Sequence, residues 1–261
     1  MAETVRRLSA TDITLLCLAA FAAGGLDAVV GGGGLIQLPA LLLVLPNTAV
    51  VTLLGTNKLA AIVGTGSAAA TYARRVDMDA PTAVRMAVAA FVGSGLGALL
   101  ATVAGSAVLR PVVLVALAAV WFYTLHRPSL GEVEALRLTP RRQAGVAVTG
   151  GLLIGMYDGF VGPGTGSFLV FLLVGAVGLS FLHASATAKA VNTMTNLAAL
   201  LLFAATGHVL WKLGLAMALC NLVGAQLGAR LAIRRGSAWV RRVFLVVVAA
   251  LILRLAFDVL P

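Results

Sequence analysis

Apolar runs of about 18–25 residues recur along the whole sequence and are separated by short polar loops. A run of this length is long enough for a helix to cross the hydrocarbon core of a bilayer. The chain is 61% hydrophobic and only 11% charged, whereas soluble domains are about a quarter charged. The runs do not alternate apolar and polar residues, as the strands of a membrane β-barrel do. The sequence therefore predicts an all-α polytopic membrane protein.

The two halves of the chain match each other without a gap when the sequence is shifted by 131 positions. The matched pairs are Gly24 and Gly155, Asp27 and Asp158, Gly31 and Gly162, Lys58 and Lys189, Gly93 and Gly224, and Arg110 and Arg241, among others. Internal repeats of this kind are typical of secondary transporters, in which the binding site lies near the bilayer midplane between the repeats. We predict membrane repeats at 1–126 and 143–261, joined by a cytoplasmic linker at 127–142.

Each half contains four to five helical segments. The predicted segments are 12–30, 35–46, 48–73, 82–104 and 107–125 in the first half, and 143–161, 166–182, 184–205, 209–229 and 240–257 in the second. The second segment of the first half has about a dozen residues, follows a run of glycines and is interrupted by Pro39 and Pro46. It is too short to cross the bilayer upright. We therefore expect Gly-rich broken or re-entrant hairpins whose tips meet near the midplane.

The basic residues predict how the halves are oriented. Arg74 and Arg75 follow the third segment, but the matching positions in the second half are uncharged. Because basic residues mark cytoplasmic loops, this difference between matching loops predicts that the two halves are inverted repeats. The basic groups within 74–85, 127–142 and 230–242 then all face the cytoplasm, and they contain twelve of the nineteen lysines and arginines. The net charge of +10 thus reflects membrane topology, and we expect no nucleic-acid partner.

Two glycine-rich turns, LDAVVGGGGLIQLP (26–39) and YDGFVGPGTGSFLV (157–170), interrupt apolar helix at matching places. Glycine leaves backbone N–H groups accessible, and free N–H groups at a helix N-terminus attract anions. The alternative is that these glycines only allow close helix packing. Neither turn continues into the GK[ST] of a phosphate-binding P-loop. We expect no cofactor and no metal site, and we interpret Cys17 and Cys220 as small packing residues.

Lys58 and Lys189 lie inside apolar segments, where an isolated charge costs at least about 2.5–3.5 kcal/mol. Each lysine therefore needs an oppositely charged partner or a water-filled cavity. One hypothesis is that both lysines bind an anionic substrate. The other is that Lys58 pairs with Asp27, and Lys189 with Asp158, within the same half. The two aspartates are in turn either proton-coupling residues or structural counter-ions.

Several further polar residues lie in the apolar segments near these charges. Thr187, Lys189, Asn192 and Asn196 fall near one face at helical spacing, which indicates either a cavity lining or hydrogen bonds between helices. The predicted substrate-binding residues are Gly31, Gly32, Gly33, Gly34, Gln37, Thr56, Asn57, Lys58, Gly162, Gly164, Thr165, Gly166, Ser167, Thr187, Lys189, Asn192 and Asn196.

The segments GLDAVVGGGGLIQLPALL (25–42), GTNKLAAIVGTGSAAATYARR (55–75) and YDGFVGPGTGSFLV, with TAK and GAQLGARLAIRRG (224–236), resemble the TauE/SafE family of sulfite exporters, and its YfcA-like branch in particular. The resemblance spans nearly the whole chain. It implies a multi-pass transporter of the bacterial inner (plasma) membrane that moves a small anion, especially sulfite or an organosulfonate. The second copy of the Gly-rich motif reads GPGTG here, where family members often carry GxGGG.

Together these features predict a secondary transporter that moves a small anion by alternating access. The expected substrate is sulfite or an organosulfur oxyanion. Its partners are the anionic substrate, the lipid bilayer and, if Asp27 or Asp158 titrates during transport, protons. The main alternative is a passive anion channel. Two less favoured interpretations are an intramembrane hydrolase, using Ser167 or Ser185 with His183, and an assembly factor without transport activity. The chain is otherwise not expected to be an enzyme, and a homo-oligomer is left open.

Overall fold

The computed structural model describes residues 9–104 and 138–259, and every regular element within them is helical. These elements are α2 (Ala10–Val30), α3 (Gly34–Val44), α4 (Val50–Ala73), α5 (Ala80–Val103), α7 (Pro140–Phe160), α8 (Thr165–Leu172), η1 (Leu173–Val177), α9 (Phe181–Ala205) and α10 (Trp211–Val259). The prediction of an all-α membrane protein is confirmed. The predicted segment 107–125 and most of the predicted linker lie outside the described residues. Helix α7 begins inside the last part of that linker.

The helices of the two halves begin at matching positions. Helix α4 starts at Val50 and α9 at Phe181, while α5 starts at Ala80 and α10 at Trp211, so both pairs are 131 residues apart. The short helix α3 likewise corresponds to α8 and the π-helical turn η1. The repeat seen in the sequence therefore extends to the secondary structure of the described residues.

Within the described residues, four helices are long and apolar enough to cross a membrane, namely Ala10–Val29, Ala80–Val103, Phe181–Ala205 and Trp211–Gly236. Two apolar elements are shorter, Gly34–Val44 and Thr165–Val177. Large apolar side chains such as Leu18, Leu99 and Leu219 are at least half exposed on the outer helices. In water such a surface would be unfavourable, whereas lipid tails solvate it.

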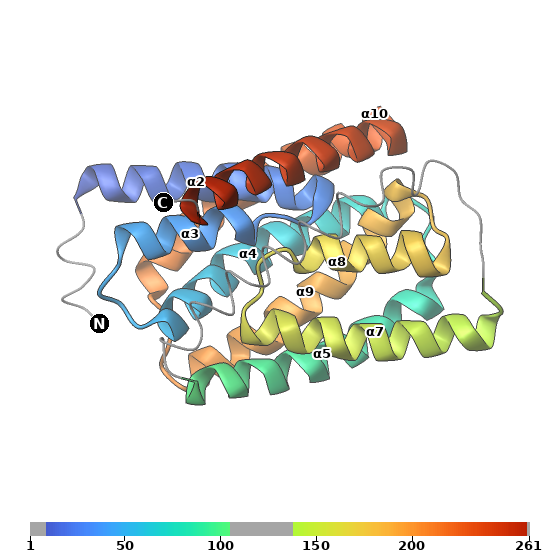
Figure 1. The fold of residues 1–261 in the computed structure, drawn as a ribbon, viewed down its shortest axis with the longest axis horizontal. Helices are drawn as coiled ribbons and strands as arrows, with labels where there is room; N and C mark the ends of the chain where they lie inside the picture. Colours follow the sequence, from blue (N-terminus) through green and yellow to red (C-terminus); the bar gives the residue numbers. More distant parts are fainter. Residues whose placement is uncertain (1–8, 105–137, 260–261) are drawn as a thin grey trace.

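Each half contributes a helical hairpin, and the two hairpins approach from opposite ends of the molecule (Figure 1). Helix α2 runs inward from the end at the left of Figure 1, and α3 returns toward that end. Helix α7 runs inward from the other end, and α8 returns there. Helices α4 and α9 pack against each other through the middle. The outer helices are exchanged between the halves, because α5 packs mainly on α7 and α10 on α2.

Glycines permit this exchange of outer helices. Gly93 of α5 lies so close to α7 that a Cβ would meet the carbonyl oxygen of Leu152, and Gly224 of α10 lies equally close to Phe21 of α2. Small residues let helix backbones approach closely where lipid provides no hydrophobic driving force. The close-packing role that we considered for glycine is thus found at matched outer positions, separate from the Gly-rich turns.

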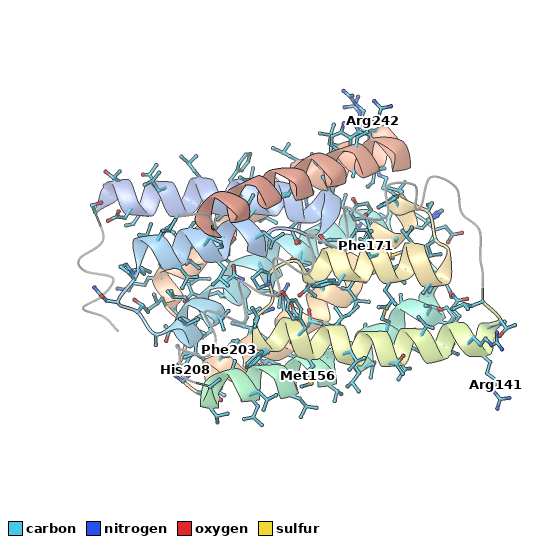
Figure 2. The ribbon with its side chains drawn as sticks, viewed as in Figure 1. Arg141, Met156, Phe171, Phe203, His208 and Arg242 are labelled. Atoms are coloured by element: carbon cyan, nitrogen blue, oxygen red, sulfur yellow. The ribbon has the colours of Figure 1, made fainter. Side chains whose placement is uncertain are left out.

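Helix α10 contains a break at Gly236, where φ is 72° and ψ is −175°. The chain reverses direction there, and the segment after it runs back toward the end at which α10 begins (Figure 1). Arg141 and Arg242 lie at one end of the molecule and His208 lies at the other (Figure 2). The end that carries these arginines also contains the C-terminal end of α4 and the N-terminal end of α5. It is therefore strongly basic.

Candidate substrate-binding site

The tips of the two hairpins touch each other. Gly31, between α2 and α3, has φ of 80°, and Gly162, between α7 and α8, has φ of 90°. Both values lie in the left-handed region that favours glycine. A Cβ added to Gly31 would overlap the backbone of Gly166, and one added to Gly34 would lie 3.2 Å from Cα of Pro163. Only residues without side chains allow this contact.

A small polar cavity lies where the tips meet α4, α9 and α10. Its volume is about 20 Å³, which is enough for roughly one water molecule. The residues that line it are Asp27, Gly31, Gly33, Gly34, Gln37, Asn57, Lys58, Ala61, Thr65, Asp158, Gly162, Gly164, Thr165, Gly166, Asn192, Asn196 and Asn221. We call this space the central cavity. In this structure its volume is too small for sulfite.

Two buried ion pairs join the halves beside the central cavity. Nζ of Lys58 lies 2.5 Å from Oδ2 of Asp158, and Nζ of Lys189 lies 2.9 Å from Oδ2 of Asp27. Lys58 is 2% exposed and Lys189 is fully buried. Pairing within each half was therefore wrong, because each lysine pairs with the aspartate of the other half. Helices α4 and α9 pack against each other at the centre, and from there each lysine reaches the hairpin of the other half.

The two aspartates differ in their other hydrogen bonds. Asp27 also accepts from the hydroxyl of Thr65 at 3.2 Å and from the backbone N–H of Gly33 at 3.3 Å. Within the described residues, the Asp158 carboxylate accepts from the ammonium of Lys58. The lysine ammonium has three donors, so Lys58 has donors available for another acceptor. The Lys58 pair is thus the less constrained of the two.

The helix N-termini of α3 and α8 add positive electrostatic potential to the central cavity. Gly33 and Gly34 at the start of α3, and Gly164 and Thr165 at the start of α8, all line it. The first N–H groups of a helix have no partner within the helix, and the helix dipole is positive there. With two lysines alongside, the site is suited to an anion.

Asn57 carries a buried polar atom without a partner. Among the described residues, Oδ1 of Asn57 is buried and accepts no hydrogen bond, and Asn57 is 5% exposed. The neighbouring side-chain amides are bonded. Nε2 of Gln37 donates to the backbone carbonyl of Asn57 at 3.3 Å, and Nδ2 of Asn221 donates to Oε1 of Gln37 at 2.9 Å. An unsatisfied buried polar group costs about 1–3 kcal/mol. This amide is therefore available to a ligand.

Most of the predicted site residues come together at the central cavity, but five of them do not line it. Lys189 lies behind Asp27, to which it donates. Thr56 accepts from the backbone N–H of Leu210 at 3.0 Å and donates to the Thr52 carbonyl at 2.7 Å, so it holds the start of α10 against α4. The other three are Gly32, Ser167 and Thr187.

Ala61, Thr65 and Asn221 line the central cavity but were absent from the predicted set. Thr65 lies seven positions after Lys58 on α4, so helical spacing alone places both on one face. Asn221 is 3% exposed in an otherwise apolar stretch of α10. A lone asparagine in such a stretch was the available signal, but its match in the first half, Ala90, carries no polar group.

The two cysteines are both free and half-buried. Cys17 lies on α2 and Cys220 on α10, two helices that pack against each other. Small side chains of this kind suit such a contact.

A family model described as sulfite exporter TauE/SafE matches residues 16–255. The chain belongs to the TauE/SafE family. Relatives of this TauE/SafE protein include "Probable membrane transporter protein ORF9" from Sinorhizobium sp, 39% identical over 94% of the chain and 93% of that protein. A probable membrane transporter protein from Haemophilus influenzae is 33% identical over 94% of the chain and 95% of its own length. "Probable membrane transporter protein YfcA" from Escherichia coli strain K12 is 35% identical over 94% of the chain and 89% of its own length. No solved structure matches the chain.

Proposed function

We propose that this chain is a secondary membrane transporter that moves a small anion, sulfite or an organosulfur oxyanion, by alternating access. The observation that carries the proposal is the pair of buried Lys–Asp bridges between the halves, beside a small polar cavity. The matching family model is described as sulfite exporter TauE/SafE, which supports the substrate class. The relatives named as membrane transporters support the transporter class.

The substrate anion competes with an aspartate for a lysine. In the closed structure the Lys58 ammonium faces Asp158, and Gly162 leaves room at its tip, since a Cβ there would lie 3.0 Å from Nζ. An anion that enters takes over one or more ammonium donors. Asp158 then loses its counter-charge and gains a proton or a new donor. Anion binding is in this way linked to a rearrangement between the halves, and proton coupling follows from the same exchange.

Alternating access would arise from the two hairpins. Their tips close the central cavity from opposite ends, so moving one hairpin opens the cavity to one side while the other keeps it shut. Inverted repeats use one such motion for each side. We propose this orientation for the two halves, with the basic end in the cytoplasm and the chain in the bacterial inner membrane.

A flux assay on the purified chain in lipid vesicles tests the proposal. Sulfite entry should saturate with concentration and should be accelerated by sulfite trapped inside the vesicles. A passive channel would give neither saturation nor acceleration. If vesicles containing folded protein move no sulfite, sulfonate or other small anion above the rate of empty vesicles, the transport function itself is wrong.

Two neighbouring residues on α4 separate a role in binding from a role in folding. Asn57→Leu removes the amide whose Oδ1 has no partner and puts an apolar group of similar size in its place. Replacing an unsatisfied polar group in this way is neutral or stabilising. We expect an unchanged or higher melting temperature in detergent together with at least about a tenfold loss of sulfite flux.

The matched control is Thr56→Val, which removes the acceptor for the Leu210 N–H. That change should lower stability by about 1–3 kcal/mol, the cost of an unsatisfied buried donor. Flux per folded molecule should stay near the parent value. Equal flux in the Asn57→Leu variant and the parent would contradict a binding role for Asn57.

A further inference from the structure

A second, larger cavity lies between α4 and α10 at the basic end of the molecule, and nothing described above accounts for it. Its volume is about 700 Å³, against about 20 Å³ for the central cavity. Its walls carry Arg74 and Arg75 from the end of α4, and Arg230 and Arg234 from α10. All four side chains are exposed. We call this space the vestibule.

The floor of the vestibule is polar and separates it from the central cavity. The amide of Gln226 donates to Ser67, and the hydroxyl of Thr71 donates to Oε1 of Gln226 at 3.4 Å. Ser67 follows Thr65 of the central cavity by two residues on α4, a rise of about 3 Å. The two spaces are therefore less than one helical turn apart along α4.

The four arginines have no acidic partner among the residues that the structure describes. Within that part of the chain, no aspartate or glutamate lines the vestibule, and none of the four arginines forms an ion pair. Four guanidinium groups around one cavity repel each other. Each presents a planar set of donors that fits two oxygens of an oxyanion. The arrangement therefore favours an anion with several oxygens.

Membrane topology alone does not require this clustering. Other arginines at the basic end, including Arg85, Arg141 and Arg235, also mark it as cytoplasmic but do not line the vestibule. The positions that match the vestibule arginines in the repeat are uncharged: Ala205, Thr206, Leu99 and Val103. The vestibule is thus a feature of the basic end of the molecule and does not arise from the repeat.

We propose that the vestibule is a second anion-binding site, for an oxyanion group of the sulfate, sulfite or phosphate class, either as a free ion or as the headgroup of an anionic lipid. The arginines hold the charged oxygens, and the hydroxyls and amide of the floor face the inner side of the ligand. This binding does not depend on the transport cycle proposed above. It places a concentrated supply of anion next to the central cavity.

The test measures sulfate binding to the full chain in an uncharged detergent by calorimetry, at constant ionic strength set with sodium chloride. The test variant is Arg74→Gln/Arg230→Gln. The control, Arg85→Gln/Arg235→Gln, removes the same charge from the same end outside the vestibule. We expect the dissociation constant to rise at least about tenfold in the test variant and less than about twofold in the control. Asn57→Leu should leave this binding intact, because Asn57 lines the central cavity and its replacement is expected to keep the protein stable.

A second arm distinguishes the two sources of the ligand. Short-chain phosphatidylglycerol is titrated into the parent and the test variant, with phosphatidylcholine as the uncharged comparison. If phosphatidylglycerol displaces sulfate from the parent and binds the test variant at least about tenfold more weakly, a lipid headgroup can occupy the site. If only sulfate binds, the ligand is a free ion. The proposal is overturned if both double variants bind sulfate equally well, if Asn57→Leu abolishes the binding, or if neither probe binds the parent.

Discussion

Replacing Lys58 with methionine is expected to destabilise the protein by about 3–5 kcal/mol and to abolish sulfite flux. The change leaves the Asp158 carboxylate, 1% exposed, without its counter-charge. Removing one partner of a buried pair has this cost because the other charge stays desolvated. The loss is measured as the melting temperature in detergent, and flux is measured in lipid vesicles for the fraction that folds.

Each lysine pairs with the aspartate of the other half, so double variants provide a control for this prediction. Adding Asp158→Asn to Lys58→Met removes the unpaired charge and should restore most of the lost stability. Adding Asp27→Asn instead should lower stability further, because it leaves Lys189 unpaired as well. Flux should stay absent in both double variants, since the positive charge that holds the anion is gone. Rescue by Asp27→Asn would show that the lysines pair within each half.

Placing a methyl group between the hairpin tips should have the second largest effect. Gly166→Ala puts a Cβ against the backbone of Gly31, and overpacking of this kind costs about 1–3 kcal/mol. Gly31→Ala adds the strain of a left-handed residue, about 1–2 kcal/mol. The tips should then fail to close, and flux should fall at least about tenfold in both variants.

Gly95→Ala is the control for the hairpin tips. Gly95 lies within α5, and a Cβ there meets no atom within 4 Å. Alanine is favoured over glycine inside a helix by about 0.5–1 kcal/mol, so this variant should be as stable as the parent or more so, with unchanged flux. Parental flux in the Gly166→Ala variant would mean that the tips do not need to meet during transport.

The membrane class and the location of the candidate site were predicted from the sequence, because apolar runs and an internal repeat are patterns of the chain itself. Long apolar runs predict transmembrane helices wherever a bilayer is the solvent. The 131-residue match paired Asp27 with Asp158 and Lys58 with Lys189, and these are the charges that meet beside the central cavity. The Gly-rich turns that we predicted as hairpin tips do touch.

Other features depend on where the helices lie relative to each other, which a single sequence does not encode locally. The vestibule forms because α4 and α10, distant in the chain, bring their arginines together. Thr56 and Asn57 are neighbours in an equally polar stretch, yet one bonds to the start of α10 and the other faces the central cavity. Asn221 enters the site from a helix without a matching polar residue in the first half.

The sequence by itself determined that the chain is a helical membrane protein of two matching halves, with one lysine and one aspartate of each half buried at the centre. Apolar length and a repeat period are properties of the chain alone, so no fold was needed to find them. Only the tertiary structure decided which lysine meets which aspartate. An internal repeat gives equal spacing in both halves, and the choice between partners depends on how α4 and α9 pack between the two hairpins, where each lysine meets the aspartate of the other half.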